Sequence, residues 1–444
     1  MNPILQLDAV ELRDRLAGGA LRAVELAEAC LEQVARREPE VGAWSYLDGD
    51  HVMQQARRLD EYRGTGRPLG PLHGLPVGLK DVIDTVGLPS ENGTPLDAGR
   101  KPPHDAYVVK RLKRAGAVIM GKTVTTELML RHPGKTRNPH NLAHTPGGSS
   151  SGSAAAVAAQ MAPLAIGTQT LGSVIRPASY CGVVGFKPSF GAIPRSGVLS
   201  QAPSLDTLGV FAGSLAAAAL LAENLYGYDE GDAATSLVPA PRLSEIAGAR
   251  APVKPAFAFV RQPAWDTADA ALQAGFAELA EALGELCDEV ALPGHFDRAM
   301  ELCELVQMTE LAKSFDHYAR RGRDQLSPVM RQTMDDGNRV LAHDYLVALD
   351  WPRLLNDALE GVFERFDAIV TPAAPGPAPE GLEWTGSAAF NGIWTFCGLP
   401  AVTLPLLQTE SGLPMGVQLV GRRGDDGRLL RTAQWLVHFL SETA

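Results

Sequence analysis

The chain has 444 residues, of which 45% are hydrophobic and 20% charged, and its formal net charge is −11 at pH 7. This composition is typical of a globular protein whose core is large enough to fold without disulfide bonds or a structural metal. The acidic balance and the lack of a long basic run disfavour nucleic-acid binding.

The N-terminal segment, the apolar runs and the cysteines bear on the cellular compartment. Segment 1–16 lacks the basic region and apolar run of a signal peptide. The longest apolar stretch, 153–167, is too short to span a bilayer and contains Gln160 and Pro163. The five cysteines show no CxxC spacing, which is typical of reduced thiols. We therefore expect a cytoplasmic protein without a membrane segment.

Hydrophobic periodicity predicts helices and strands that alternate along the chain. Helices are expected as two segments within 5–37 and at 50–63, 107–115, 215–225, 268–283, 296–320, 325–366 and 428–439, and another is expected to begin at 125–130. Strands are expected at 41–47, near the end of 73–85, and at 117–122, 164–168, 208–213, 256–260, 367–372, 401–407 and 416–421. The polar, aperiodic segment 229–255 is expected to be a surface excursion or a boundary between two halves. This alternation predicts an α/β fold with a largely buried sheet.

Small residues gather in segment 144–191, which is poor in charge. Gly and Ser cluster at 147–153 and again at 170–173. Such residues let backbones approach closely and let N–H groups face a ligand. We therefore expect the chemistry of the protein to take place here.

Three separated side chains could act together in this region. Ser173 follows the strand expected at 164–168, so its hydroxyl would lie at a strand end, with the backbone N–H groups of 170–173 free to bind an oxyanion. Lys80 ends another expected strand, and burial would lower its pKa from about 10.4 so that it could accept a proton. Ser149 could relay that proton. Taken singly, Lys80 is more often a surface lysine and Ser173 a turn serine.

Other patterns compete with this hypothesis. Residues 148–152 match the GxSxG nucleophile elbow with Ser150 as nucleophile, but an elbow follows a strand and 138–146 is expected to be a loop. No GK[ST] follows the glycines, and no zinc-binding spacing occurs. The sequence therefore implies neither a metal nor a cofactor.

The segments that carry these side chains closely resemble the amidase signature family. GLPVGLKD resembles the lysine motif of the family, GGSSSGSAAAVA its Gly/Ser signature, and TLGSVIRPASYCGVVGFKP the segment of its nucleophile. The likeness extends to 398–421. It implies one α/β domain over 1–444, with a large mixed sheet covered by helices on both faces. The signature core would lie at about 73–215, and the part at about 256–444 would complete the sheet and the substrate pocket.

The resemblance also implies a Ser–cis-Ser–Lys triad. Ser173 would be the nucleophile, Ser149 the bridging serine after a cis peptide from Gly148, and Lys80 the base. Ser173 would attack the substrate carbonyl while Lys80 takes a proton through Ser149, and water would then hydrolyse the acyl-enzyme. The other implied site residues are the backbone donors Thr170, Leu171, Gly172 and Ser173 of an oxyanion hole, and Ser151, whose hydroxyl would join the network.

The chain departs from the family pattern beside the nucleophile. Leu171 stands where glycine is usual, which is expected to remove positive-φ freedom beside the oxyanion hole and to add an apolar wall. Gln169 stands where aspartate is usual, and Ser151 replaces a frequent glycine. Arg176 is displaced by one position, so the usual role of that arginine is not transferred to it. No triad member is lost, so we expect activity to remain.

By analogy, the substrate pocket is expected to be walled by 128–137, 193–203, 305–308 and 390–394. These walls are mainly apolar, which favours an aryl or alkyl acyl amide, an anilide or a carbamate over a charged substrate. Each wall residue, taken singly, could equally be an ordinary core residue. The candidate contacts are Leu128, Met129, Gln201, Phe390, Asn391 and Trp394.

Three functions follow from these expectations. The leading one is a hydrolase of amide C–N bonds, with carbamates and esters as further candidate substrates. It would act on a small molecule as a monomer or homodimer, without nucleic acid or membrane. The second is the amidase subunit of a tRNA-dependent glutamine amidotransferase, which Leu171 and the acidic charge disfavour. The third is a catalytically silent binding protein on the same fold, which the three triad positions disfavour.

Overall fold

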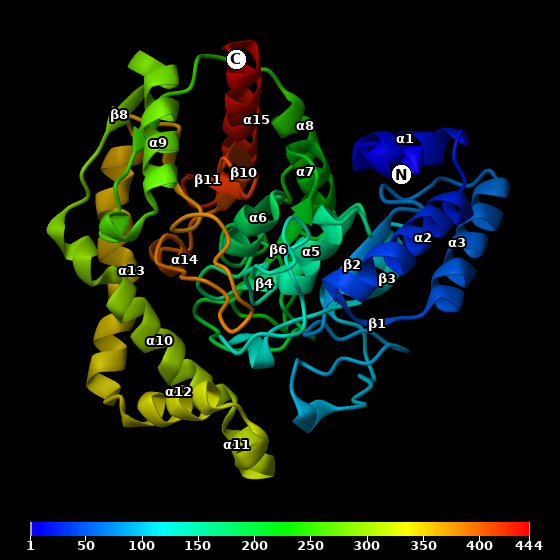
Figure 1. Ribbon diagram of the computed structural model, residues 1–444, viewed down its shortest axis with the longest axis horizontal. Helices are drawn as coiled ribbons and strands as arrows, with labels where there is room; N and C mark the ends of the chain where they lie inside the picture. The colour runs from blue at the N-terminus through cyan, green and yellow to red at the C-terminus, as the bar shows by residue number, and fades with distance from the viewer. Residues whose placement is uncertain (1, 444) are drawn as a thin grey trace.

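The computed structural model describes residues 2–443 and contains one mixed sheet within them (Figure 1). Eleven strands form this sheet in the order β1-β3-β2-β4-β6-β5-β10-β11-β9-β7-β8. Their bounds are β1 Trp44–Leu47, β2 Pro76–Lys80, β3 Val118–Thr123, β4 Leu164–Gln169, β5 Val184–Lys187, β6 Thr207–Ala212, β7 Phe257–Phe259, β8 Cys287–Glu289, β9 Ala368–Pro372, β10 Ala401–Gln408 and β11 Pro414–Val420.

The sheet is parallel at two places and antiparallel elsewhere. Strand β2 pairs in parallel with both β3 and β4, and β7 pairs in parallel with β8 and β9. In the β2–β4 pair, Leu79 lies opposite Ile166. Since parallel strands end at the same edge of a sheet, the ends of β2 and β4 lie side by side. Lys80 and the segment before Ser173 are thereby brought together.

Helices surround the sheet (Figure 1). Helices α5 and α6 pack on each other and on strands in the middle of the sheet, while α7, α8 and α15 form a second group against β5, β6 and β10. The helix bounds are α1 Ala9–Gly18, α2 Ala23–Val41, α3 Gly49–Gly64, α4 Tyr107–Arg114, α5 Ser151–Ala158, α6 Ile175–Cys181, α7 Leu215–Glu223, α8 Leu243–Gly248, α9 Ala270–Leu283, α10 Ala299–Ser314, α11 Asp316–Gly322, α12 Pro328–Arg339, α13 Ala342–Phe363, α14 Gly392–Phe396 and α15 Asp426–Thr443.

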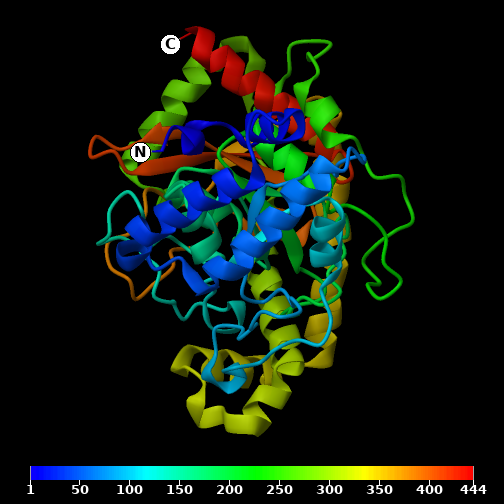
Figure 2. The same ribbon diagram turned by 90° about the vertical axis from the view of Figure 1, so that its right-hand side faces the viewer.

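The helices α11 and α12 lie away from the sheet, at the far end of the yellow part of the ribbon in Figure 2, and α10 and α13 connect them to the core. Their far end is tied to the loop after β2. Asn92 Nδ2 donates to the Tyr318 hydroxyl at 3.3 Å, and Arg321 pairs with Asp97 at 3.0 Å. Helix α11 is therefore held against the loop after β2.

The α/β fold with a large mixed sheet, expected from the sequence, is confirmed, and most expected elements are present. Two differ. The helix expected to begin at 125–130 is only a 3-10 turn, Glu127–Met129, because Leu128 and Met129 have φ of 45° and 63° and cannot continue a right-handed helix. The long helix expected at 296–320 is divided at Phe315 into α10 and α11.

The segment 229–255 is more firmly attached than its polar composition indicates. It contains α8, in which Leu243 and Ala247 are buried, and its Asp232 forms an ion pair with Arg195 at 2.7 Å. The sheet takes its strands from residues 44 to 420 without a break at this segment. That the whole chain is one domain stays a prediction.

Candidate active site

Lys80 is the last residue of β2, a strand in which every position is buried. Its Nζ lies 2.6 Å from Ser149 Oγ and 2.7 Å from Thr168 Oγ1. Burial lowers the pKa of Lys80 well below its ordinary value, and the nearby Arg176 acts in the same direction, while Asp206 opposes them. Burial thus shifts the amine toward its neutral form, in which nitrogen has a lone pair that can accept a proton.

Ser149 follows a cis peptide bond from Gly148, in the loop before α5. Arg176 donates from Nη2 to the Gly148 carbonyl oxygen at 2.6 Å, and the backbone N–H of Thr126 donates to the Ser149 carbonyl at 3.3 Å. A Cβ added at Gly148 would lie 2.9 Å from the Thr385 side chain. The loop is thus held from both sides, and position 148 has no room for a side chain.

Ser173 lies between the end of β4 and the start of α6. It lines a cavity of about 190 Å³ and is 8% exposed. Within residues 2–443, its hydroxyl forms no hydrogen bond with another protein group, and the backbone N–H groups of 170–173 donate to no protein acceptor. Of segment 170–173, Leu171 and Ser173 line this cavity, so an unbonded hydroxyl and unpaired backbone donors lie beside it. That these donors form an oxyanion hole stays a prediction.

The segment around Ser173 is fixed by Gln169. Its Oε1 accepts hydrogen bonds from the backbone N–H groups of Val174 and Ile175 at 2.9 and 3.0 Å, which closes the turn across Ser173. Its Nε2 donates to Thr395 Oγ1, and that hydroxyl donates to the Leu171 carbonyl at 2.7 Å. Sequence reasoning gave Gln169 no role, although a polar residue at the buried end of a strand was a signal for one.

Asp206 holds the same segment from the opposite side. It accepts from the Thr170 hydroxyl at 2.7 Å and from the backbone N–H groups of Gln201 and Ala202. Burial raises the pKa of Asp206 to about 6. This residue was missed because its contact with the segment before Ser173 joins Asp206 to Thr170, 36 residues earlier in the sequence.

Leu171 does not have a backbone conformation that would call for glycine. The non-glycine residues of positive φ in the described chain are Asn92, Leu128, Met129 and Gln160, so position 171 needs no glycine. The Leu171 side chain lines the cavity beside Ser173, as expected for an apolar wall.

Ser150 and Ser151 lie outside the catalytic contacts. The Ser150 hydroxyl is fully buried, donates to the Thr168 carbonyl at 3.0 Å and accepts from the Thr168 N–H at 3.2 Å. It has no access to a substrate, so the nucleophile-elbow hypothesis is wrong. The Ser151 hydroxyl donates to the Val124 carbonyl at 3.3 Å. Because that bond points toward β3, the structure gives Ser151 no bond to Lys80, Ser149 or Ser173.

The cavity beside Ser173 is more polar than the sequence predicts. Arg131, Arg176 and Glu304 line it together with Gln307 and the exposed indole of Trp384. Within residues 2–443, neither Arg131 nor Glu304 forms an ion pair. The expectation of a mainly apolar wall is therefore wrong. Of the expected walls, 128–137 contributes Met129, Leu130 and Arg131 and 305–308 contributes Gln307, whereas 193–203 lines another cavity and 390–394 does not line this one.

Of the six candidate substrate contacts, only Met129 lines this cavity. Gln201 is fully buried, where it donates to the Leu128 carbonyl and accepts from Gln307. Asn391 donates to the Ala373 carbonyl at 2.9 Å, behind Gly172. These side chains support the cavity from behind and do not contact it. The candidates to which this correction applies are Leu128, Gln201, Phe390, Asn391 and Trp394.

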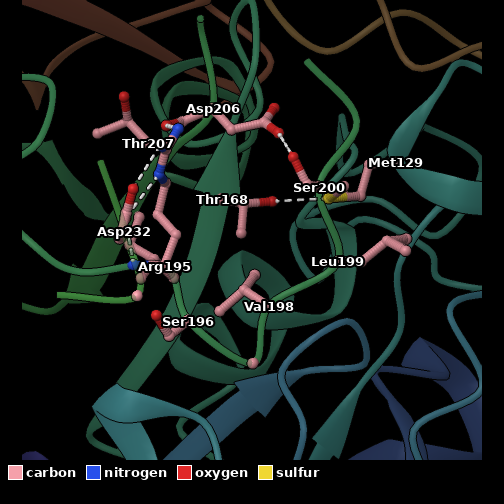
Figure 3. A pocket seen from close by; sticks show the side chains of 13 residues that line it. Met129, Thr168, Arg195, Ser196, Val198, Leu199, Ser200, Asp206, Thr207 and Asp232 are labelled. Atoms are coloured by element: carbon pink, nitrogen blue, oxygen red, sulfur yellow. Dashed lines mark hydrogen bonds and ion pairs between the residues drawn. The ribbon is translucent and has the colours of Figure 1, made fainter. Parts of the chain in front are cut away.

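Met129 also lines a second cavity, of about 260 Å³ (Figure 3). Its lining includes Thr168, Asp206 and the Arg195–Asp232 ion pair. Figure 3 shows the Thr168 hydroxyl directed at the Met129 sulfur, and the two atoms are 3.3 Å apart. Met129 therefore lines both cavities and contacts Thr168, which is a hydrogen-bond partner of the Lys80 amine.

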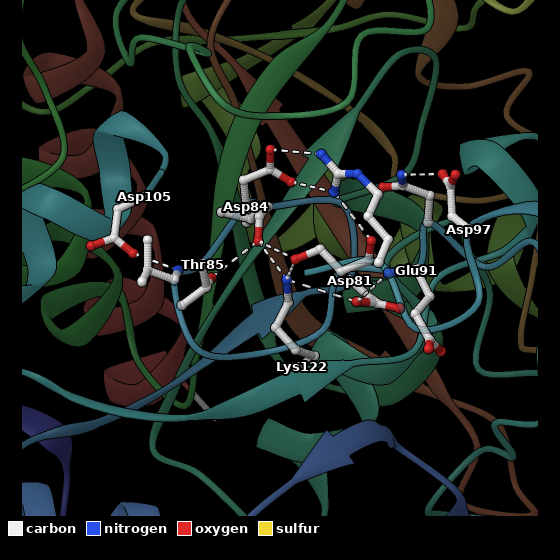
Figure 4. Close-up of polar contacts among 12 residues, drawn as sticks. Asp81, Asp84, Thr85, Glu91, Asp97, Asp105 and Lys122 are labelled. Atoms are coloured by element: carbon white, nitrogen blue, oxygen red, sulfur yellow. Dashed lines mark hydrogen bonds and ion pairs between the residues drawn. The ribbon is translucent and has the colours of Figure 1, made fainter. Parts of the chain in front are cut away.

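A second buried lysine, Lys122 on β3, lies near the loop after β2 (Figure 4). Its Nζ donates to Ser90 Oγ at 2.6 Å and to the Ile83 carbonyl, and it lies 3.7 Å from an Asp81 carboxylate oxygen. Burial lowers its pKa to about 8. These contacts fix the loop and include neither Ser149 nor Ser173, whereas Lys80 contacts Ser149.

Neither a metal cluster nor a membrane helix is found in the described part of the chain. Among residues 2–443, no three His, Cys, Asp or Glu side chains gather in a way that could hold a metal ion. Over the same residues, no helix is both long and apolar enough to cross a bilayer.

Comparison with known proteins shows what the whole chain is similar to. The chain is 35% identical to a Glutamyl-tRNA(Gln) amidotransferase subunit of Symbiobacterium thermophilum, over 96% of this chain and 95% of that protein. Its fold matches a peptide amidase solved with the competitive inhibitor chymostatin, with a TM-score of 0.86 and 28% identity over 98% of each chain. It also matches a chain of a vestigial protein complex linked to the origins of an s-triazine catabolic enzyme, with a TM-score of 0.91 and 27% identity over 97% of this chain and 98% of the other. The Amidase family model matches residues 25–430, and the chain therefore belongs to the Amidase family.

Proposed function

We propose that the chain is a serine hydrolase that cleaves amide C–N bonds through an acyl-enzyme on Ser173. One observation supports this above all: a fully buried lysine contacts Ser149 at the sheet edge where the unpaired hydroxyl of Ser173 faces a cavity. Neutral Lys80 is the base, Ser149 is the proton relay, and Ser173 is the nucleophile. A silent binding protein would have no need for a buried amine at this place, since its desolvation is unfavourable.

In the first step, the Ser173 oxygen bonds to the substrate carbonyl carbon. The Ser173 proton passes to Ser149 as the proton of Ser149 passes to the Lys80 nitrogen. The carbonyl π pair moves onto oxygen, and the unpaired N–H groups of 170–173 stabilise that oxyanion. The oxyanion then collapses, the C–N bond breaks, and Lys80 returns the proton through Ser149 to the leaving amine. Water attacks the acyl-enzyme by the reverse route and releases the acid.

The substrate is a small-molecule amide, with carbamates and esters as further members of the proposed range. Arg131, Arg176 and Glu304 line the cavity, so the substrate would carry polar or charged groups in addition to an apolar part. We propose that the chain acts without a cofactor and as a single folded domain in the cytoplasm.

A second candidate is the amidase subunit of a tRNA-dependent glutamine amidotransferase. It rests on the relatives named as subunits of such an amidotransferase, the first of which is 35% identical over nearly the whole chain. This candidate would act with partner proteins, and glutamine would be its amide substrate. Hydrolysis of glutamine only when such partners are added would favour it over the hydrolase.

The test is covalent labelling of the intact protein with a fluorophosphonate, followed by intact mass and peptide mapping. One adduct on Ser173 of the wild type, greatly slowed in Lys80→Met, is the expected result. A screen of amides, anilides and carbamates then gives the substrate range. No adduct, or an adduct on Ser150, would overturn the proposed role of Ser173.

A further inference from the structure

A neutral lysine has two N–H bonds and one lone pair, and only the lone pair can act as a base. Lys80 Nζ has two polar neighbours, Ser149 Oγ and Thr168 Oγ1, at 2.6 and 2.7 Å. Both neighbours are hydroxyls, and a hydroxyl can either donate or accept. If the Thr168 hydroxyl donated to Lys80 Nζ, the lone pair would point to Thr168 and could not accept a proton from Ser149.

The second neighbour of Thr168 gives its hydroxyl another acceptor. Its Oγ1 lies 3.3 Å from the sulfur of Met129 (Figure 3). A thioether has no hydrogen to give and can only accept. When the Thr168 hydroxyl donates to that sulfur, its oxygen is left to accept an N–H bond from Lys80. The lone pair then points to the remaining neighbour, Ser149.

From this geometry we infer that Thr168 and Met129 are positioning residues which direct the lone pair of Lys80 toward Ser149. The inference rests on the proposed function, because it assigns the orientation of the proposed base. The same arrangement suits the protonated lysine, since Thr168 accepts from an ammonium as readily as from an amine. The contact therefore stabilises the charge that develops on Lys80 as Ser173 attacks.

The backbone conformation of Met129 indicates that the surrounding structure holds its side chain in this position. Met129 has a φ of 63° and is 4% exposed, and the Leu128 before it also has positive φ. Non-glycine residues seldom adopt this conformation unless the surrounding structure holds them there. Here it places Met129 where it lines both cavities, with its sulfur against Thr168.

Three variants separate this role from a packing role. Thr168→Val keeps the shape and removes the hydroxyl, Thr168→Ser keeps the hydroxyl, and Met129→Leu keeps the volume and removes the acceptor. Met161→Leu is the matched control. The Met161 sulfur is also buried and accepts from Trp44 Nε1 at 3.2 Å, but it precedes β4, whereas Thr168 lies near the end of that strand.

The measurement is the second-order rate of Ser173 labelling by a fluorophosphonate as a function of pH. In this reaction the Ser173 oxygen–phosphorus bond forms, the P–F bond breaks, fluoride leaves, and the hydroxyl proton moves through Ser149 to Lys80. Thr168→Val and Met129→Leu should lower the plateau rate about tenfold, less than the roughly 10²-fold or greater loss expected without the base. Both should also move the acidic limb to lower pH. Thr168→Val removes an acceptor of the ammonium, and Met129→Leu frees Thr168 to donate to the amine.

Thr168→Ser should have the labelling rate and the acidic limb of the wild type, and Met161→Leu should change neither. Thermal unfolding checks that each variant is folded. A Met129→Leu profile equal to the wild type, or a Thr168→Ser rate as low as that of Thr168→Val, would overturn the inference. Failure of the proposed function is a distinct result, namely a wild type that is not labelled at Ser173.

Discussion

Arg176 donates a 2.6 Å hydrogen bond from Nη2 to the carbonyl oxygen of Gly148. This bond joins the helix after Ser173 to the loop that carries Ser149, so the two serines are held on one support. Arg176 is almost completely buried, which lowers the pKa of its guanidinium to about 10. Arg176, which is displaced by one position from the family pattern, therefore holds the loop of Ser149 in this chain.

Replacing this arginine should slow catalysis more than it affects folding. Arg176→Met leaves the Gly148 carbonyl without its donor, and a hydrogen bond to a charged group contributes about 1.5–3 kcal/mol. If that energy holds Ser149 in place, Ser173 labelling should slow roughly 10- to 100-fold. The labelling rate of Arg176→Met and Arg176→Lys, measured beside their melting temperatures, tests this. A labelling rate equal to that of the wild type in both variants would show that the bond does not position Ser149.

The neutral form of Lys80 should make the protein less stable than it would be without the amine. The folded-state pKa of Lys80 is lowered, so between that value and about 10.4 the unfolded chain binds a proton that the folded protein does not. Stability therefore rises with pH in this window and falls as the pH drops below about 10.4. Lys80→Met lacks this group and should be more stable than the wild type at pH 7, with a smaller difference at pH 10.

Urea denaturation at the two pH values measures this difference. A stability difference between the wild type and Lys80→Met that is the same at pH 7 and pH 10 would mean that folding does not lower the pKa of Lys80.

Ser150→Ala should reduce stability without removing the nucleophile. The substitution leaves the buried N–H and carbonyl of Thr168 without their partner, which should lower the free energy of unfolding by about 1–3 kcal/mol. The Ser173 adduct should still form at a rate near that of the wild type once folding is established. Ser173→Ala is the matched variant and should give no adduct. Loss of the adduct in folded Ser150→Ala would support Ser150 as the nucleophile, as the GxSxG pattern indicates.

Leu171 should limit the size of the group that enters beside Ser173. It lines the cavity and is 8% exposed, so Leu171→Ala enlarges the space beside the nucleophile. The cost in stability should fall near the lower end of the roughly 2–5 kcal/mol seen for such truncations. The ratio of labelling rates for a bulky and a small fluorophosphonate should rise in Leu171→Ala. An unchanged ratio would show that another wall sets the size limit.

Much of the site could be predicted because local patterns determine it. Strand β2 ends at Lys80 and β4 ends just before Ser173 because apolar β-forming runs stop there, and parallel pairing then brings both ends to one edge. The cluster of small residues marks the loop of Ser149. The rest of the site depends on contacts between segments that are far apart in the sequence. The cavity takes Glu304 and Gln307 from α10 and Trp384 from a loop, and no periodicity indicates how these meet.

The wrong predictions also arise where contacts between distant segments decide the structure. Phe390 and Trp394 are apolar, and hydrophobicity alone cannot tell a pocket wall from the core behind it; both are fully buried. The turn at Leu128 and Met129 was expected to begin a helix because its residues favour helices, and the tertiary structure instead holds both at positive φ. Thr168 was passed over because a strand threonine gives no sequence signal of its contact with Lys80.

The central claim is that neutral Lys80 activates Ser173 through Ser149. The most direct measurement compares two titrations on the same protein: the pKa of Lys80, followed by NMR of lysine labelled with ¹³C at Cε, and the acidic limb of the Ser173 labelling rate. The expected result is one shared midpoint, well below the ordinary lysine value of about 10.4, with both signals lost in Lys80→Met. A Lys80 that titrates near about 10.4, or a limb that persists in Lys80→Met, would contradict the claim.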